Sequence, residues 1–158
     1  MSARKEKEIR MQLRSAEDLV VYQRAYELAM EIFQTTKRFP AEERYSMTDQ
    51  IRRSSRSVCA NLREAWAKRR YEAHFVSKLT DADGENAETS TWLDFAHSCR
   101  FIDTPRHTQL TTLSREVGAM LGKMISNPTP FLWKPVVGGQ KSAVRSQKSE
   151  IRDQRSDD

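Results

Sequence analysis

The apolar positions between residues 16 and 128 recur at intervals of three and four, which is the spacing of residues on one face of an α-helix. Glycine and proline, which interrupt helices, are absent over long stretches. No glycine precedes Gly84, and no proline lies between Pro40 and Pro105. Alanine, leucine, glutamate, arginine and lysine, which favour helices, occur throughout. The pattern therefore predicts a helical body.

The first expected helix spans residues 16–37. Ser15 and Asp18 form a pair of the capping-box type at its start, with aspartate in place of the usual glutamate. Pro40 sets its end, because proline disfavours a helical conformation in the residue before it. Its apolar residues form two adjacent stripes, which are Val21, Ala25, Leu28 and Ile32 in one and Tyr22, Tyr26, Ala29 and Phe33 in the other.

The second expected helix spans residues 47–69 and follows another cap-like pair, Ser46 and Asp49. Small residues in the middle of its buried stripe permit the close approach of a neighbouring helix. The stripe consists of Met47, Ile51, Ser54 or Ser55, Val58, Leu62, and Ala65 or Trp66.

The third expected helix spans residues 72–101 and carries a heptad-like seam about three heptads long. Asn86 and Thr89 are polar residues within this seam, and we interpret them as locally hydrogen-bonded rather than as ligands of a bound molecule. The seam residues are Phe75, Leu79, Ala82, Asn86, Thr89, Leu93 and Ala96.

The fourth expected helix begins with Thr104 as its N-cap and Pro105 at the first helical position, and Asn127 and Pro128 end it. Gly118 and Gly122, four residues apart inside this helix, indicate close contact with another helix, within the bundle or between subunits. Its stripe consists of Leu110, Leu113, Val117, Met120 or Leu121, and Met124.

Four helices joined by short connections predict an all-α fold, an up-down-up-down four-helix bundle over residues 15–128. Residues 1–14 are expected to form a flexible basic arm. Residues 129–158 are expected to form a low-complexity, disordered tail, in which Phe131, Leu132 and Trp133 can dock on the body. Beyond the tail's two glycines a degenerate seven-residue repeat has one apolar residue per repeat, too few for a coiled coil.

The net charge of +5 is compatible with nucleic-acid binding, but the positive charge is unevenly distributed along the chain. Residues 1–15 and 129–158 contain the whole excess, and the body between them is neutral. Within the body, residues 47–70 hold seven basic and two acidic groups, whereas residues 71–103 hold seven acidic and two basic groups. The second and third helices therefore carry opposite charges.

Helical spacing places three arginines of the second helix on one face and three carboxylates of the third helix on another. With a tight turn near residues 70 and 71, partners have numbers that sum to about 141. We interpret the two sets as an interhelical charge ladder, with a phosphate-binding stripe as the alternative. The ladder consists of Arg52 near Glu88, Arg56 near Glu85, and Arg63 near Lys78 or Asp81.

The stronger candidates for nucleic-acid binding are Lys68, Arg69 and Arg70, at the end of the second helix, with Glu72 as the nearest acidic group that follows them. Arg53 is a further candidate. Trp66 and Trp92, like the tyrosines, can stack on bases, but their helical spacing favours a role in the core or in an interface.

The sequence contains no motif that is typical of a metal site or of an enzyme active site. A di-metal bundle site needs two Glu-x-x-His pairs, and the chain offers a single Asp94-x-x-His97, with His74 and His107 standing alone. No nucleophile motif or phosphate-cradling glycine loop occurs. We therefore expect no enzyme activity, no cofactor, no metal and no small-molecule substrate.

The remaining composition bears on location. No uncharged run approaches the length of a membrane span, and Glu6 and Glu8 argue against a signal peptide. Cys59 and Cys99 are too few for a disulfide scaffold and are interpreted as buried thiols. The sequence therefore predicts a cytoplasmic protein with no membrane partner.

Residues 39–66, FPAEERYSMTDQIRRSSRSVCANLREAW, carry a recognisable combination of features. They are Phe-Pro, an acidic pair, Thr-x-Gln-Ile-Arg-Arg and Ser-Val-x-Ala-Asn. Over residues 15–128 the chain resembles the four-helix-bundle proteins first noticed as products of intervening sequences in bacterial 23S ribosomal RNA genes. It departs from them at residues 62–65, where many members have Ile-Ala-Glu-Gly, and at Gly84-Glu85, where many have Gly-Ser.

The resemblance implies a homo-oligomer, a ring-like pentamer, with a role at RNA or the ribosome and no enzymatic activity. The architecture is also similar to that of the accessory variability proteins of diversity-generating retroelements, whose basic pentamers engage nucleic acid. The leading hypothesis is an oligomeric module that binds RNA or a ribonucleoprotein. The alternative is a protein–protein interaction scaffold with no nucleic-acid role, which the neutral body favours.

Overall fold

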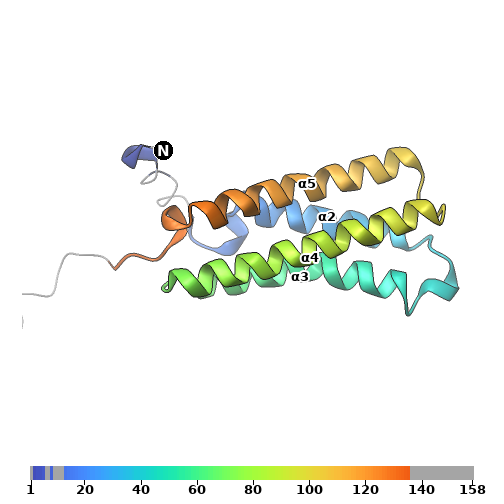
Figure 1. Cartoon of the computed structure of the whole chain (residues 1–158), viewed down its shortest axis with the longest axis horizontal. Helices are drawn as coiled ribbons and strands as arrows, with labels where there is room; N and C mark the ends of the chain where they lie inside the picture. The colour runs from blue at the N-terminus through green and yellow to red at the C-terminus, as the bar shows by residue number, and fades with distance from the viewer. Residues whose placement is uncertain (1, 6–7, 9–12, 136–158) are drawn as a thin grey trace, which may run out of the picture.

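The computed structural model describes residues 2–5, 8 and 13–135, and every regular element within them is helical (Figure 1). This confirms the all-α prediction. The predicted disorder of the tail concerns residues 136–158, which lie outside the described residues, as do residues 1, 6–7 and 9–12 of the predicted arm. The elements are η1 (Ala16–Asp18), α2 (Val20–Thr36), η2 (Ala41–Glu43), α3 (Met47–Ala67), α4 (Glu72–Ser98), α5 (Thr104–Ser126) and η3 (Thr129–Phe131).

The start of the first long helix differs from the prediction. The Asp18 carboxylate accepts hydrogen bonds from the backbone N–H groups of Ser15, at 2.9 Å, and Arg14, at 2.7 Å. The predicted pair is therefore present, but it caps the start of the single 3₁₀ turn η1 and not the start of α2. Leu19 follows with an extended backbone and a buried side chain, and α2 begins at Val20. The extended Leu19 separates η1 from α2, and its side chain is buried in the core.

The predicted pairing of Ser46 with Asp49 at the start of α3 is also wrong. Glu43 acts there instead: one of its carboxylate oxygens accepts hydrogen bonds from the Ser46 hydroxyl and from the Met47 N–H, the latter at 3.2 Å. A carboxylate near a helix N-terminus satisfies free N–H groups and interacts well with the helix dipole. Glu43, which provides this carboxylate, is the last residue of the preceding turn η2.

The other helix ends shift by a few residues. The N-cap of α5 is Asp103 rather than Thr104, because the Asp103 carboxylate accepts a hydrogen bond from the Arg106 N–H at 2.9 Å. The helix α3 ends at Ala67 and α4 ends at Ser98, earlier than predicted. The end of α5 lies where Asn127 and Pro128 predict it.

The core consists of two apolar clusters separated by a buried polar layer. One cluster lies around Leu62, Phe75 and Leu121, and the other around Ile32 and Leu93. All seven predicted seam residues of α4 are buried, as predicted. The buried polar residues at mid-height on α3, α4 and α5 are Ser54, Ser55, Asn86, Thr89 and Ser114.

Hydrogen bonds inside this layer tie α4 to both neighbouring helices. The Asn86 side-chain amide donates to the Ser114 carbonyl at 2.9 Å, and the Ser114 hydroxyl donates back to the Asn86 side-chain oxygen at 3.1 Å. The Thr89 hydroxyl donates to the Ser54 hydroxyl at 2.9 Å. The interpretation of Asn86 and Thr89 as locally bonded is therefore confirmed. Satisfied buried groups of this kind select one register between helices.

The predicted close contact of the two glycines in α5 holds at one of them. A Cβ atom added to Gly118 would lie 3.3 Å from the side-chain nitrogen of Asn86, so a larger residue would press on the polar layer. A Cβ atom added to Gly122 would meet nothing within 4 Å. Gly118 therefore allows α4 and α5 to approach each other, whereas Gly122 lies on an open surface.

Candidate nucleic-acid interface

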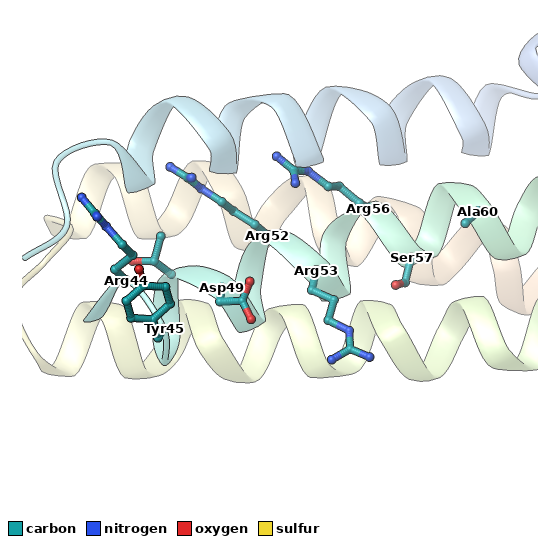
Figure 2. Close-up of a pocket in the computed structure, with 9 residues that line it drawn as sticks. Arg44, Tyr45, Asp49, Arg52, Arg53, Arg56, Ser57 and Ala60 are labelled. Carbon is teal, nitrogen blue, oxygen red and sulfur yellow. The ribbon is translucent and has the colours of Figure 1, made fainter. Parts of the chain in front are cut away.

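The arginines of the predicted ladder contact α2 instead of α4, which corrects that prediction. Figure 2 shows Arg52 and Arg56 pointing towards α2. The Arg52 guanidinium donates a hydrogen bond to the Thr36 hydroxyl at 2.7 Å and lies 4.9 Å from the centre of the Phe33 ring. The Arg56 guanidinium lies 5.8 Å from the centre of the same ring.

The third ladder arginine, Arg63, makes an ion pair with Glu17 and donates a hydrogen bond to the Tyr22 hydroxyl at 3.1 Å. Within the described residues, the ion pair that joins α3 to α4 is formed by Lys78 and Glu64, at 2.8 Å. The Lys78 ammonium holds the pKa of Glu64 below its usual range. The sequence therefore identified a shared face of α3 correctly but assigned it the wrong neighbour.

The predicted ladder carboxylates on α4 have other surroundings. Asp81 lies 3.3 Å from the Lys78 ammonium, on its own helix. The Glu88 carboxylate accepts a hydrogen bond from the Trp92 indole at 3.1 Å. Burial and the nearby Glu88 carboxylate raise the pKa of Glu85, and the Arg53 guanidinium opposes this shift. None of these three carboxylates therefore forms its predicted ion pair with Arg52, Arg56 or Arg63 in the described residues.

The basic residues at the end of α3 form a compact cluster with two tryptophans. The Arg69 guanidinium lies 4.1 Å from the centre of the Trp66 ring and donates to the Trp66 carbonyl at 2.8 Å. The Arg70 guanidinium lies 4.3 Å from the centre of the Trp133 ring. The backbone N–H of Trp133 in turn donates to the backbone carbonyl of Arg69 at 3.1 Å. We call Trp66, Lys68, Arg69, Arg70 and Trp133 the Arg–Trp cluster.

The sequence did not connect Trp133 with this cluster, because the residue was assigned to the tail. Phe131 in η3 explains the connection: its ring lies 6.4 Å from that of the buried Phe75, so packing in the core holds η3 against the bundle. The packed body therefore extends beyond the predicted boundary at residue 128. The apolar run of residues 131–133 is the signal that indicates docking.

The Arg–Trp cluster presents cations and aromatic faces together at one end of the bundle. Trp133 is 41% exposed. Tyr71, which follows Arg70 in the connection between α3 and α4, is 66% exposed. Burial, followed by the charge of Arg70, lowers the pKa of Arg69, but an arginine stays protonated in proteins. Within the described residues, no carboxylate lies within ion-pair distance of Lys68, Arg69 or Arg70. Such a surface can stack on bases and contact phosphates.

Arg53 lies in a different place from this cluster. It points towards α4 from a groove of about 590 Å³ on the outer face of α3 (Figure 2). Fifteen residues of helix separate it from Lys68, which corresponds to about 23 Å at 1.5 Å per residue. The groove is lined by Arg44, Tyr45, Thr48, Asp49, Arg52, Arg53, Arg56, Ser57 and Ala60. We call it the arginine groove.

A second, larger groove is apolar and lies between the start of α2 and the end of α5. Its volume is about 1080 Å³. Val20, which lies on its wall, is 60% exposed, and Gly122 lines it from α5. Tyr26 and Met30, further along α2, are 55% and 43% exposed. This surface is therefore apolar and uncovered in a single chain.

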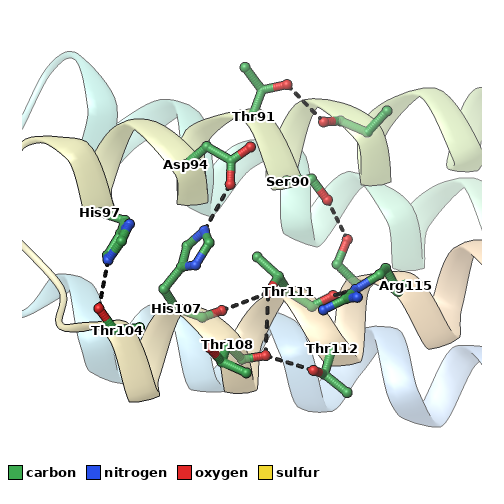
Figure 3. A network of polar contacts seen from close by, with 12 residues as sticks. Ser90, Thr91, Asp94, His97, Thr104, His107, Thr108, Thr111, Thr112 and Arg115 are labelled. Carbon is green, nitrogen blue, oxygen red and sulfur yellow. Dashed lines mark hydrogen bonds and ion pairs between the residues drawn. The ribbon is translucent and has the colours of Figure 1, made fainter.

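The structure brings two histidines together that the sequence treated as separate. The rings of His97 and His107 are stacked with their centres 4.5 Å apart. His107 Nε2 lies 2.8 Å from the Asp94 carboxylate, whereas His97 Nε2 lies 3.1 Å from the Thr104 hydroxyl (Figure 3). The Nε2 atoms of the two rings therefore face different partners. Within the described residues, no group of three or more His, Cys, Asp or Glu side chains is placed to hold a metal ion.

The cysteines differ in their environments. Cys59 is half-buried, and burial raises the pKa of its thiol to about 11, so this thiol is neutral at pH 7. Cys99 is exposed, which corrects the prediction that both thiols are buried. In the described part of the chain, no helix combines the length and hydropathy needed to cross a membrane.

Fold and surface of the described residues together define a small helical protein, built on four long helices, with a basic, aromatic end. Among solved structures, the chain is similar to a protein of unknown function from the S23 ribosomal protein family of Bacteroides thetaiotaomicron. The TM-score is 0.63 and the identity 30%, over 68% of this chain and 96% of that one. No curated protein matches the chain. The chain belongs to the 23S rRNA-intervening sequence protein family, which matches residues 17–123.

Proposed function

We propose that the protein is a non-enzymatic, homo-oligomeric four-helix bundle that binds RNA in the cytoplasm through its Arg–Trp cluster. The observation that carries the proposal is the pair of guanidiniums stacked on Trp66 and Trp133 beside Lys68. The family's name connects it with 23S ribosomal RNA, which supports RNA as the partner. The two free cysteines support a reducing compartment.

The chemistry of the cluster suits a single strand of RNA. Every base has a π-face, so an exposed indole stacks on bases with little regard to their identity. A guanidinium already stacked on an indole keeps its N–H groups at the edge, where they can donate to phosphate oxygens. Because Arg69 and Arg70 are held by Trp66 and Trp133, little side-chain entropy is lost when RNA binds.

An up-down-up-down order of the helices is part of the proposal. Contacts between neighbouring helices support it, because in each case the late part of one helix meets the early part of another. Such contacts arise when neighbours run in opposite directions. The contacting pairs are Thr36 and Arg52, Glu64 and Lys78, Asp94 and His107, and Glu31 and Arg106.

The uncovered apolar surface of α2 and its groove with α5 support assembly into a homo-oligomer. Exposed apolar area of this extent is typical of interaction sites. The family resemblance points to five subunits. We expect light scattering at micromolar protein concentration to give a mass several times that of one chain, and a monomer would contradict this part of the proposal.

Trp133→Ala is expected to weaken the binding of a single-stranded RNA oligonucleotide by about 10- to 100-fold at low salt, because one stacked base contributes about 1–3 kcal/mol. Fluorescence anisotropy of labelled RNA measures the change. The matched control is Phe95→Ala, which removes a ring that is 53% exposed on α4, away from the Arg–Trp cluster. The control is expected to bind like the wild type.

Two results would decide against this function. Equal losses in W133A and F95A would mean that the Arg–Trp cluster has no special role. A wild-type protein that binds no RNA at low ionic strength would favour the alternative, a protein–protein interaction scaffold that uses its apolar surface.

A further inference from the structure

The arginine groove on α3 has the composition of an anion site, and it is separate from the Arg–Trp cluster. We propose that it binds phosphate groups of the RNA backbone, as a second contact surface for the strand that the Arg–Trp cluster holds. This inference rests on the proposed function. The groove combines an excess of positive charge, an unpartnered hydroxyl and an exposed aromatic ring.

The groove carries an excess of positive charge. Four arginines line it, against the single acidic residue Asp49, and their guanidiniums lie along its edges, with Arg52 and Arg56 towards α2 and Arg53 towards α4 (Figure 2). Within the described residues, none of the four arginines lies within ion-pair distance of a carboxylate. Arg44, Arg53 and Arg56 are also exposed. Like charges gathered in this way repel one another, and a bound anion would relieve the repulsion.

A buried hydroxyl that has no partner lies in the wall of the same groove. Thr48 is only 8% exposed, and its hydroxyl oxygen is the single buried side-chain polar atom of the described residues that makes no hydrogen bond. A buried polar group without a partner costs about 1–3 kcal/mol, so native structures seldom keep one without a reason. A phosphate oxygen is an acceptor to which the Thr48 hydroxyl can donate.

Two features favour a nucleic acid over an acidic protein segment as the occupant. Tyr45, which lines the groove, is 86% exposed and offers a ring on which a base can stack. Ser57 and Ala60 are small and leave room along the helix, so a backbone can lie close to α3. Planar guanidiniums match the oxygens of a phosphate group in pairs.

The groove and the Arg–Trp cluster lie along one helix. From Arg53 to Arg69 the distance along α3 and its end is about 24 Å, which several nucleotides of a single strand can span. A strand that follows α3 can therefore reach both surfaces of one chain.

The test compares Arg53→Gln/Arg56→Gln with a matched control, Arg38→Gln/Arg115→Gln, which removes two exposed arginines elsewhere. Each phosphate contact to a single strand contributes about 0.7 to the slope of log K against log salt. We expect R53Q/R56Q to reduce that slope by about 1.4 and to weaken binding of a single-stranded RNA about 10-fold at low salt. The control is expected to keep the wild-type slope.

Pyrophosphate probes the groove without RNA. We expect it to raise the melting temperature of the wild-type protein and of W133A, but not that of R53Q/R56Q. Thr48→Val, which removes the unpartnered hydroxyl at nearly constant volume, is expected to melt at or above the wild-type temperature and to show a smaller shift with pyrophosphate. An unchanged shift in T48V would count against the inference.

The outcomes separate this inference from the proposed function. If R53Q/R56Q keeps the affinity and salt slope of the wild type while W133A loses affinity, the groove is overturned as a contact and the proposed function stands. If pyrophosphate acts through the groove but the wild type binds no RNA, RNA is overturned as the source of the phosphate, together with the proposed function. If neither ligand acts, both proposals fall, and an acidic protein segment becomes the remaining occupant.

Discussion

Phe75→Ala is expected to lower the free energy of unfolding by about 3–5 kcal/mol, the usual cost of removing a buried phenyl ring. Phe75 is fully buried in the apolar cluster that contains Leu62 and Leu121. The tight packing of a helical core leaves a cavity when the ring is removed. Because Phe75 also packs against Phe131, the same change is expected to loosen η3 and the Trp133 that follows it.

Chemical denaturation followed by circular dichroism measures this loss. Phe95→Ala is the control, since it removes the same side chain from the same helix at an exposed position, where a change of about 0.5 kcal/mol or less is expected. Below its melting temperature, F75A is also expected to bind RNA more weakly than F95A. Equal stability of the two variants would contradict the described core.

Neutralising Lys68, Arg69 and Arg70 to glutamine is expected to weaken RNA binding by about 100-fold at low salt, which corresponds to about 2.8 kcal/mol. Three phosphate contacts to a single strand would also contribute about 2.1 to the salt slope, and the variant should lose this contribution. In an oligomer the cluster is presented several times, so avidity amplifies the loss. Binding measured over a series of salt concentrations tests both numbers.

Arg69 needs a separate variant, because its guanidinium also packs on Trp66 and bonds to the Trp66 carbonyl. Lys68→Gln/Arg70→Gln leaves that contact in place and is expected to keep the wild-type melting temperature while losing most of the affinity. Deletion of residues 1–12 controls for the basic arm. A triple variant with wild-type affinity and an unaltered salt slope would remove the Arg–Trp cluster from the RNA interface.

The sequence alone predicted much of the helical body. The spacing of apolar residues identified the four long helices α2 to α5 of the described residues and every buried position of the α4 seam, including the polar Asn86 and Thr89. Such a pattern is local, because the face to which a residue belongs depends only on its position in the helix. The exact helix ends were predicted less well. Glu43, rather than Ser46 and Asp49, provides the side-chain contact at the start of α3.

The neighbour that each face meets was decided by the tertiary structure. Spacing placed Arg52, Arg56 and Arg63 on one side of α3, but both α2 and α4 pack against that helix, and the charge pattern favoured the wrong one. The Phe33 ring and the Thr36 hydroxyl on α2 are the contacts of Arg52. Neither residue carries a charge, so no charge pattern could indicate them.

The candidate site divides in the same way. The sequence determined that Lys68, Arg69 and Arg70 form a basic run at a helix end, because adjacent residues at such an end are necessarily close. The stacking of Arg70 on Trp133 joins residues far apart in the chain, and it depends on the packing of Phe131 against Phe75. Local spacing determines helices and their faces, whereas contacts between distant segments arise only when those faces pack into one core.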